Sequence, residues 1–169
     1  MTTNIATTKE QSARLLQCGV SAESADMHWH GAIVPRGGSL ASPPEPSEEW
    51  DLFNSPYGFM PEEMQKAKLM EDYNEIIPAW SLSALLDLLP EKIEDGYWLT
   101  IQKCNRGKNA SVHYGIAYFK CKWDNPEDIS NSTITTLGRL KYFTDCNLIE
   151  AVCKMIEWLT ANNYKLNQL

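Results

Sequence analysis

The chain has 169 residues, an apolar fraction of 43% and a formal net charge of −7. A chain of this length can bury its own core, so we expect a single domain over residues 1–169 that needs no disulfide or metal support. The acidic balance argues against generic attraction to duplex DNA or to an anionic membrane, and no run approaches the roughly 20 apolar residues of a membrane span.

The N-terminal segment predicts two short helices followed by extended chain. Thr7 and Glu10 have the spacing of a capping box, in which a hydroxyl and a carboxylate satisfy free backbone donors. The helix that they begin is expected to end at Gly19, because glycine readily adopts the left-handed conformation that terminates helices. Ser21 can cap a short second helix that continues through Asp26, and residues 27–34 have an extended pattern.

Residues 31–61 are rich in proline and glycine, with six of the nine prolines of the chain. Proline lacks the backbone donor that helix interiors and sheets need, so this segment predicts a long ordered loop or an arm. Its aromatic side chains either fold back onto the core or form anchors for a ligand or partner. The ligand-binding candidates in this segment are Trp50, Phe53, Tyr57 and Phe59.

Three further helices are indicated by caps and by helical spacing of apolar residues. One is expected from Pro61 to about Asp72. The next begins at Ser81 and buries Leu82, Leu85, Leu86 and Leu89. The last begins at Asp145 and continues to the Asn162–Asn163 stop, with one apolar stripe formed by Leu148, Val152, Met155, Ile156 and Leu159.

The strands are predicted in the second half of the chain. Residues 97–104 and 111–123 are rich in strand-forming side chains and are separated by a polar loop that contains glycine, which indicates a hairpin. A third strand is expected near residues 133–143. The predicted fold class is therefore α+β: one small antiparallel sheet with about four helices, mainly on one face, and the long proline-rich loop.

One pattern suggests a metal site. On a strand, alternate residues share a face, so Asp26, His28 and His30 could point the same way. Two imidazoles placed in this way can bind one zinc ion, with His113 or a carboxylate as the third ligand. The alternative is a pair of surface or networked histidines beside a buried Trp29. We favour that alternative and expect no tightly bound metal and no cofactor; a small metal-dependent enzyme is the competing hypothesis.

The predicted hairpin combines bases with aromatic residues. Residues 96–125 have a net charge of +4, and residues 41–95 have a net charge of −10. Lys120 and Lys122, with the aromatic residues of the hairpin, are candidates for binding single-stranded nucleic acid or a nucleotide, because bases stack on aromatic rings. Val112, Tyr114, Ile116 and Tyr118 also alternate as the core face of a solvated hairpin would, and this alternative stays open.

The cysteines and the first residues indicate the compartment. The five cysteines are an odd number and include no C-x-x-C pair, so we expect reduced, mostly buried thiols. Cys146 lies where the last helix is expected to begin, beside Asp145 and with no histidine nearby in sequence, which favours packing over nucleophilic chemistry. Residues 1–10 are polar and show no secretory signal, so we expect a cytoplasmic protein.

Three sequence blocks occur in a familiar order: residues 10–20 with Ala25-Asp26-Met27, residues 77–90, and residues 147–164. Together they resemble a group of small accessory proteins, without an assigned activity, that are encoded in prophages and mobile elements of gut anaerobes. The resemblance implies an intracellular accessory protein for which a host component is a candidate partner. It transfers no functional residue.

The sequence thus favours a non-enzymatic accessory or regulatory protein that binds a protein or a small ligand, and leaves the oligomeric state open. A small metal-dependent enzyme and a binder of single-stranded nucleic acid or nucleotides are the alternatives. Binding of duplex DNA and association with a membrane are not expected.

Overall fold

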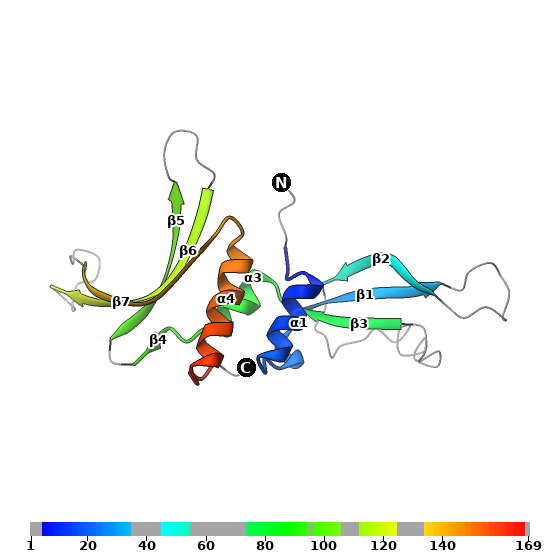
Figure 1. The fold of residues 1–169 in the computed structure, drawn as a ribbon, viewed down its shortest axis with the longest axis horizontal. Coiled ribbons are helices and arrows are strands. Elements are labelled where there is room, and N and C mark those ends of the chain that lie inside the picture. Colours follow the sequence, from blue (N-terminus) through cyan, green and yellow to red (C-terminus); the bar gives the residue numbers. More distant parts are fainter. Residues whose placement is uncertain are drawn as a thin grey trace. The chain divides into compact units, whose positions relative to one another are not determined.

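The computed structural model describes residues 5–34, 45–54, 74–94, 96–105, 112–124 and 134–167. The fold is mixed α+β with two antiparallel sheets (Figure 1). The chain divides into two compact units, Met1–Ala84 and Leu85–Leu169, and each is described by itself. The α+β class is confirmed, but the single predicted sheet is wrong, because three strands of the first unit form a sheet of their own. A single domain over residues 1–169 stays a prediction.

The first unit begins with helix α1 (Lys9–Gln17), whose start lies one residue later than predicted. Thr8 is the N-cap: its hydroxyl accepts a hydrogen bond from the Gln11 amide, and the Gln11 side chain accepts one from the Thr8 amide at 2.8 Å. Thr7 is unavailable as the cap because it is buried, where its hydroxyl accepts a hydrogen bond from the Trp80 amide at 3.0 Å.

The predicted second helix is only the short 3₁₀ helix η1 (Ala22–Ser24). Ser21 caps it as expected, since its hydroxyl accepts a hydrogen bond from the Glu23 amide at 3.3 Å. The chain leaves the helix before Asp26, whose carboxylate binds Ser81 instead. This contact explains why the helical segment is shorter than the sequence suggests.

The first sheet has the strand order β2-β1-β3, with all pairs antiparallel. The central strand is β1 (Met27–Val34), which agrees with the predicted extended segment. Its neighbours are β2 (Glu45–Phe53) and β3 (Asn74–Ala79). One face of this sheet packs with the N-terminal segment in a core of Ala6, Met27 and Ala79, against which Trp29 and Leu52 also lie.

Strand β2 corrects the expectation of a loop throughout residues 31–61. Both outer strands contain a proline, Pro46 in β2 and Pro78 in β3. Proline is tolerated there because an edge strand has one side without a neighbouring strand, where a backbone donor is not needed. The remainder of the predicted proline-rich loop, and the helix expected over residues 61–72, lie outside the described residues.

The second unit contains a four-stranded antiparallel sheet of order β4-β5-β6-β7. Its strands are β4 (Lys92–Ile93), β5 (Tyr97–Asn105), β6 (Val112–Trp123) and β7 (Ile134–Asp145). The predicted hairpin and the predicted third strand are therefore confirmed. β7 contains two register shifts against β6, one opposite Tyr118/Phe119 and one opposite Lys120/Cys121.

Helix α3 (Leu82–Asp87) spans the boundary between the two units, and helix α4 (Leu148–Ala161) belongs to the second unit. Figure 1 shows α4 alongside β6, and it contacts both β6 and β7. The predicted stripe of α4 is buried except for Leu148, which is half-buried. The buried residues of the second unit include Leu85, Leu88, Leu89, Ile116, Tyr118, Val152, Met155, Ile156 and Leu159. Leu82 and Leu86 are only half-buried, so the predicted leucine stripe is rotated toward Leu85, Leu88 and Leu89.

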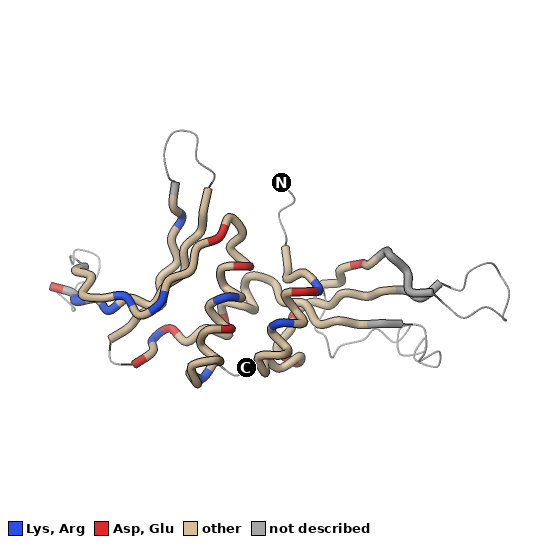
Figure 2. Tube along the Cα trace, viewed as in Figure 1, with Lys and Arg blue, Asp and Glu red and all other residues tan. Residues whose placement is uncertain are grey.

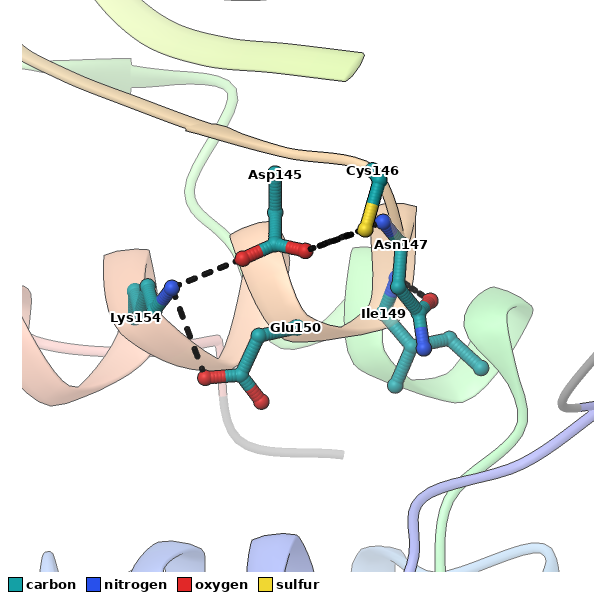
Figure 3. Close-up of polar contacts among 6 residues, drawn as sticks. All are labelled: Asp145, Cys146, Asn147, Ile149, Glu150 and Lys154. Carbon is teal, nitrogen blue, oxygen red and sulfur yellow. Dashed lines mark hydrogen bonds and ion pairs between the residues drawn. The ribbon is translucent and has the colours of Figure 1, made fainter. Parts of the chain in front are cut away.

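The start of α4 also differs from the prediction (Figure 3). Asn147, not Asp145, is the N-cap, and its side-chain oxygen accepts a hydrogen bond from the Ile149 amide at 3.0 Å. Asp145 supports this cap from outside the helix, because its carboxylate accepts hydrogen bonds from the Asn147 amide at 3.0 Å and from Lys154 Nζ at 2.8 Å. The exposed Cys146 thiol donates to the same carboxylate at 3.5 Å.

The described residues contain three α-helices, where about four helices were expected. Within the part of the chain that the structure describes, no helix is both long enough and apolar enough to cross a membrane.

Candidate functional site

The strand register sorts the side chains of the second sheet onto two faces, and one of them packs against α4. Residues directly opposite each other on antiparallel strands share a face. Tyr118 is fully buried, lies opposite Leu99 and Lys141, and donates a hydrogen bond to the Pro90 carbonyl at 2.7 Å. Burial raises the pKa of the Tyr118 hydroxyl. Lys141 Nζ lies 6.0 Å from the centroid of the Trp158 ring of α4, so this side is the helix face.

The opposite side of the sheet combines aromatic rings with cations. A row crosses all four strands: Lys92 lies opposite Trp98, Trp98 opposite Phe119, and Phe119 opposite Arg139. Trp98 keeps 37% of its surface exposed, Lys92 and Arg139 are exposed, and Phe119 is half-buried. We call this side the open face and define it by these four residues and Tyr142.

Tyr142 lies in the next row of the open face, opposite Ala117. Its ring extends over the backbone of Gly115, where an added Cβ would come within 2.7 Å of the ring. The hydroxyl reaches across to β5, where it lies 3.9 Å from the Cys104 sulfur. The Arg139 guanidinium is 5.0 Å from the ring centroid. Tyr142 is therefore held between the sheet backbone and an exposed cation.

The strands of the second sheet are rich in positive charge (Figure 2). The residues of β5, β6 and β7 include five bases, Lys103, Lys120, Lys122, Arg139 and Lys141, and one acid, Asp145. That acid forms an ion pair with Lys154 at 2.8 Å. On the open face itself, Lys92 Nζ lies 5.6 Å from the centroid of the Trp98 ring. Cations therefore lie beside rings in two separate places on one sheet face.

The two lysines that the sequence singled out do not contribute to the open face. Lys120 lies opposite Tyr97 on the helix face, with its ammonium 5.8 Å from the Tyr97 ring centroid. Lys122 is exposed two residues further along the same strand. Sequence reasoning missed Arg139 and Tyr142, because only the register of β7 brings them to the aromatic rows. Alternation along β6 could have indicated Phe119, which is out of phase with the buried Ile116 and Tyr118.

The residues of the predicted metal site have other contacts. Both carboxylate oxygens of Asp26 accept hydrogen bonds from Ser81, from its amide at 2.8 Å and from its hydroxyl at 2.5 Å. The buried His28 ring stacks on Phe53 with a centroid distance of 5.3 Å and an interplanar angle of 9°. His30 meets the same ring edge-on at 5.8 Å.

The histidines on β1 share a face, as the alternation predicted, but Asp26 precedes the strand. His113 belongs to the second unit, on β6 opposite Cys104. Among the residues that the structure describes, no group of three or more His, Cys, Asp or Glu side chains could hold a metal ion.

Two of the four aromatic candidates in the proline-rich segment, Trp50 and Phe53, are residues of strand β2 of the first sheet. Trp50 lies opposite Gly31, and a Cβ at Gly31 would come within 2.8 Å of the Trp50 ring. Lys9 Nζ lies 3.9 Å from the centroid of that ring. Phe53 contacts the two histidines, and both aromatic residues are half-buried. Tyr57 and Phe59 lie outside the described residues.

No protein-family model matches the chain, and no curated protein or solved structure matches it. The resemblance to accessory proteins of prophages and mobile elements stays a prediction, and the geometry of the open face carries the functional argument.

Proposed function

We propose that the chain is a non-enzymatic binding protein that binds single-stranded nucleic acid on the open face of its second sheet. The observation that supports this proposal is the combination of Trp98, Phe119 and Tyr142 with Lys92 and Arg139 on the side of the sheet turned away from α4. Rings on a sheet can stack on unpaired bases, while neighbouring cations pair with backbone phosphates.

Charge complementarity favours this ligand over a generic apolar partner. A purely apolar surface would suit a protein interface, but here a cation accompanies the ring in each of two rows, at 5.6 Å for Lys92 and Trp98 and at 5.0 Å for Arg139 and Tyr142. A ligand that offers both flat rings and negative charge satisfies both kinds of group. Every nucleotide of a nucleic acid has this composition, because it contains a flat base and a negatively charged phosphate.

The same geometry favours a single strand over a duplex. Bases in a duplex are already stacked on each other, so they cannot use the rings of a sheet without unpairing. The chain also has a net charge of −7, which opposes the long-range attraction on which non-specific duplex binding depends. The expectation that duplex DNA is not bound therefore remains part of the proposal.

Fluorescence anisotropy with a labelled oligothymidylate tests the proposal. Trp98→Ala and Phe119→Ala are each expected to weaken binding about five- to 150-fold, since stacking of a base on an aromatic side chain contributes about 1–3 kcal/mol. Ile101→Ala is the matched control. Ile101 is on the same strand as Trp98, is 39% exposed, and lies opposite the buried Ile116 on the helix face.

The control variant is expected to bind as the unmodified protein does, and the duplex form of the oligonucleotide is expected to bind far more weakly. Failure of the unmodified protein to bind the oligothymidylate would overturn the proposal. Equal losses for Trp98→Ala and Ile101→Ala would also overturn it, because binding would then not depend on the face. Thermal melts of each variant verify that the fold is intact.

A further inference from the structure

We propose that Arg139, supported by the Tyr142 ring, is a preorganised phosphate-binding residue that anchors one backbone phosphate of the bound strand. This inference rests on the proposed function and deepens it, because it assigns one part of the open face to the backbone of the ligand. Trp98 and Phe119 then contact bases, and the Arg139–Tyr142 pair contacts the phosphate.

The first observation is the register shift in β7. Residues three apart on a regular strand point to opposite faces, as Arg139 and Tyr142 would. In the structure Lys141 lies opposite Tyr118, whereas Arg139 lies opposite Phe119, so Leu140 is an extra residue in β7. Bulges re-aim side chains in this way. The extra residue brings Arg139 and Tyr142 to the same face.

The second observation is the support beneath the ring. Glycine at position 115 leaves room for Tyr142, since a Cβ there would lie 2.7 Å from both ring atom Cε2 and the hydroxyl oxygen. The ring thus rests on the backbone of the central part of the sheet, with its hydroxyl near Cys104. An aromatic ring held against a sheet in this way gives the guanidinium a fixed surface on which to lie.

The third observation is the state of the Arg139 side chain. It is exposed and its guanidinium is 5.0 Å from the Tyr142 ring centroid. A guanidinium can stack on an aromatic ring through its plane while its N–H groups remain available to a phosphate. Stacking restricts the long side chain before the ligand arrives, so less conformational entropy is lost when the phosphate binds.

The position of Arg139 fits this role. It lies directly opposite Phe119 and in the same row as Trp98, so it borders the surface on which bases would stack. A phosphate next to a stacked base would therefore lie within the reach of the guanidinium. Lys103 offers the comparison: it is exposed on the same sheet but lies opposite Tyr114 on the helix face.

The test measures binding of single-stranded oligothymidylate and oligoadenylate against salt concentration. Arg139→Gln is expected to weaken binding of both oligonucleotides about tenfold and to reduce the salt slope by about 0.7, the value for one phosphate contact on a single strand. The losses should be equal for both, since a phosphate contact carries no sequence information. Lys103→Gln removes the same charge from the helix face and is expected to leave the affinity and the slope nearly unchanged.

Three further variants separate the charge of Arg139 from its support. Arg139→Lys and Tyr142→Leu keep a cation at position 139 but remove the stacking, so both should weaken binding severalfold with little change in salt slope. Gly115→Ala, which pushes against the Tyr142 ring without removing it, should act in the same direction.

The outcomes distinguish this inference from the proposed function. If Arg139→Gln behaves like Lys103→Gln while Trp98→Ala still weakens binding, the assignment of Arg139 is overturned and the binding face stands. If Tyr142→Leu binds as tightly as the unmodified protein, the support by the ring is overturned. If the unmodified protein binds neither oligonucleotide, both proposals are overturned together.

Discussion

Both sheets contain an aromatic ring that lies between a glycine and a cation, but the two stacks differ in the origin of the cation. In the first sheet, the Trp50 ring covers Gly31, and Lys9 Nζ lies 3.9 Å from the ring centroid. Lys9 is the first residue of α1, so this stack joins a helix to the sheet. It lies on the sheet face that also carries Trp29 and Leu52, which pack on the core.

In the second sheet all members of the stack come from the sheet itself. Tyr142 covers Gly115, and Arg139 lies over the ring from the same strand as Tyr142. The stack is on the face turned away from α4, and Arg139 is exposed. The same arrangement of groups therefore joins a helix to the sheet when the helix supplies the cation, and has an exposed cation when a strand supplies it.

The largest expected effect is on the cores of the two units. Leu15 in the first unit and Ile156 in the second are both fully buried. Truncation of either to alanine should lower the free energy of unfolding by about 2–5 kcal/mol, because it removes buried methyl groups and leaves a cavity. Urea denaturation followed by tryptophan fluorescence and circular dichroism measures both losses.

Leu86→Ala serves as the control, since Leu86 is only half-buried and should cost less than Ile156→Ala. If residues 1–169 form a single domain, the two core variants displace one common transition. Two separate transitions, each moved by only one of the variants, would contradict the single domain. A loss below about 1 kcal/mol for Ile156→Ala would contradict the core assignment.

The elements that the sequence predicted well are those whose signal is local. The apolar stripe of α4 and the alternation along β6 each repeat along a single segment. Val152, Met155, Ile156 and Leu159 of the stripe are buried as expected, as are Ile116 and Tyr118 of β6, whereas Leu148 is half-buried and Val112 is exposed. The predictions of the helix N-caps were less accurate. Thr7 and Asp145 have the right chemistry for caps, but their side chains contact Trp80 and Lys154 instead. The N-caps are Thr8, one residue after Thr7, and Asn147, two residues after Asp145.

The elements that the sequence did not predict depend on pairing between distant segments. β2 and β3 each contain a proline and, as edge strands, do not need the alternation or the full set of backbone donors that a central strand shows. The open face needs the register of four strands and the extra residue Leu140 in β7. Neither the register nor the extra residue can be inferred from the sequence of a single segment. The sequence therefore indicated Lys120 and Lys122, which are close in sequence to the aromatic residues, as the candidates.

Substitution of Gly31 and of Gly115 by alanine should lower the stability of the protein by different amounts, and this difference tests the comparison of the two stacks. Gly31→Ala should destabilise the protein by about 1–3 kcal/mol, because the Trp50 ring is packed together with Lys9 of α1 and must shift when a Cβ is added. Gly115→Ala should cost less than about 1 kcal/mol, because the conflict is with the far end of Tyr142, which can move away from the sheet on the open face.

Denaturant melts of both glycine variants, measured under identical conditions, give the two values. A larger loss of unfolding free energy for Gly115→Ala than for Gly31→Ala would contradict the view that the Tyr142 ring can move without disturbing a core. It would instead place Tyr142 among the residues that hold the second unit together.

The smallest expected effect concerns the ion pair at the start of α4 (Figure 3). Burial alone would raise the pKa of the Asp145 carboxyl, but hydrogen bonds from Lys154, the Asn147 amide and Cys146 outweigh it and hold this pKa below its ordinary value. Because Lys154 is partly exposed, with 36% of its side-chain surface accessible, Lys154→Met should cost only about 0.2–1 kcal/mol near neutral pH.

The sign of the pH dependence follows from the lowered pKa. The contribution of Asp145 is present above the pKa that the carboxyl has in the unfolded chain, about 3.9, and is lost as the pH falls through the lower pKa of the folded protein. The difference in stability between the unmodified protein and Lys154→Met should therefore shrink across that acidic range. Lys165→Met, which removes an exposed lysine of the same unit, should show no such convergence. A difference that persists at the acidic end would mean that Lys154 stabilises α4 through packing of its alkyl chain, since that contribution does not depend on the charge of Asp145.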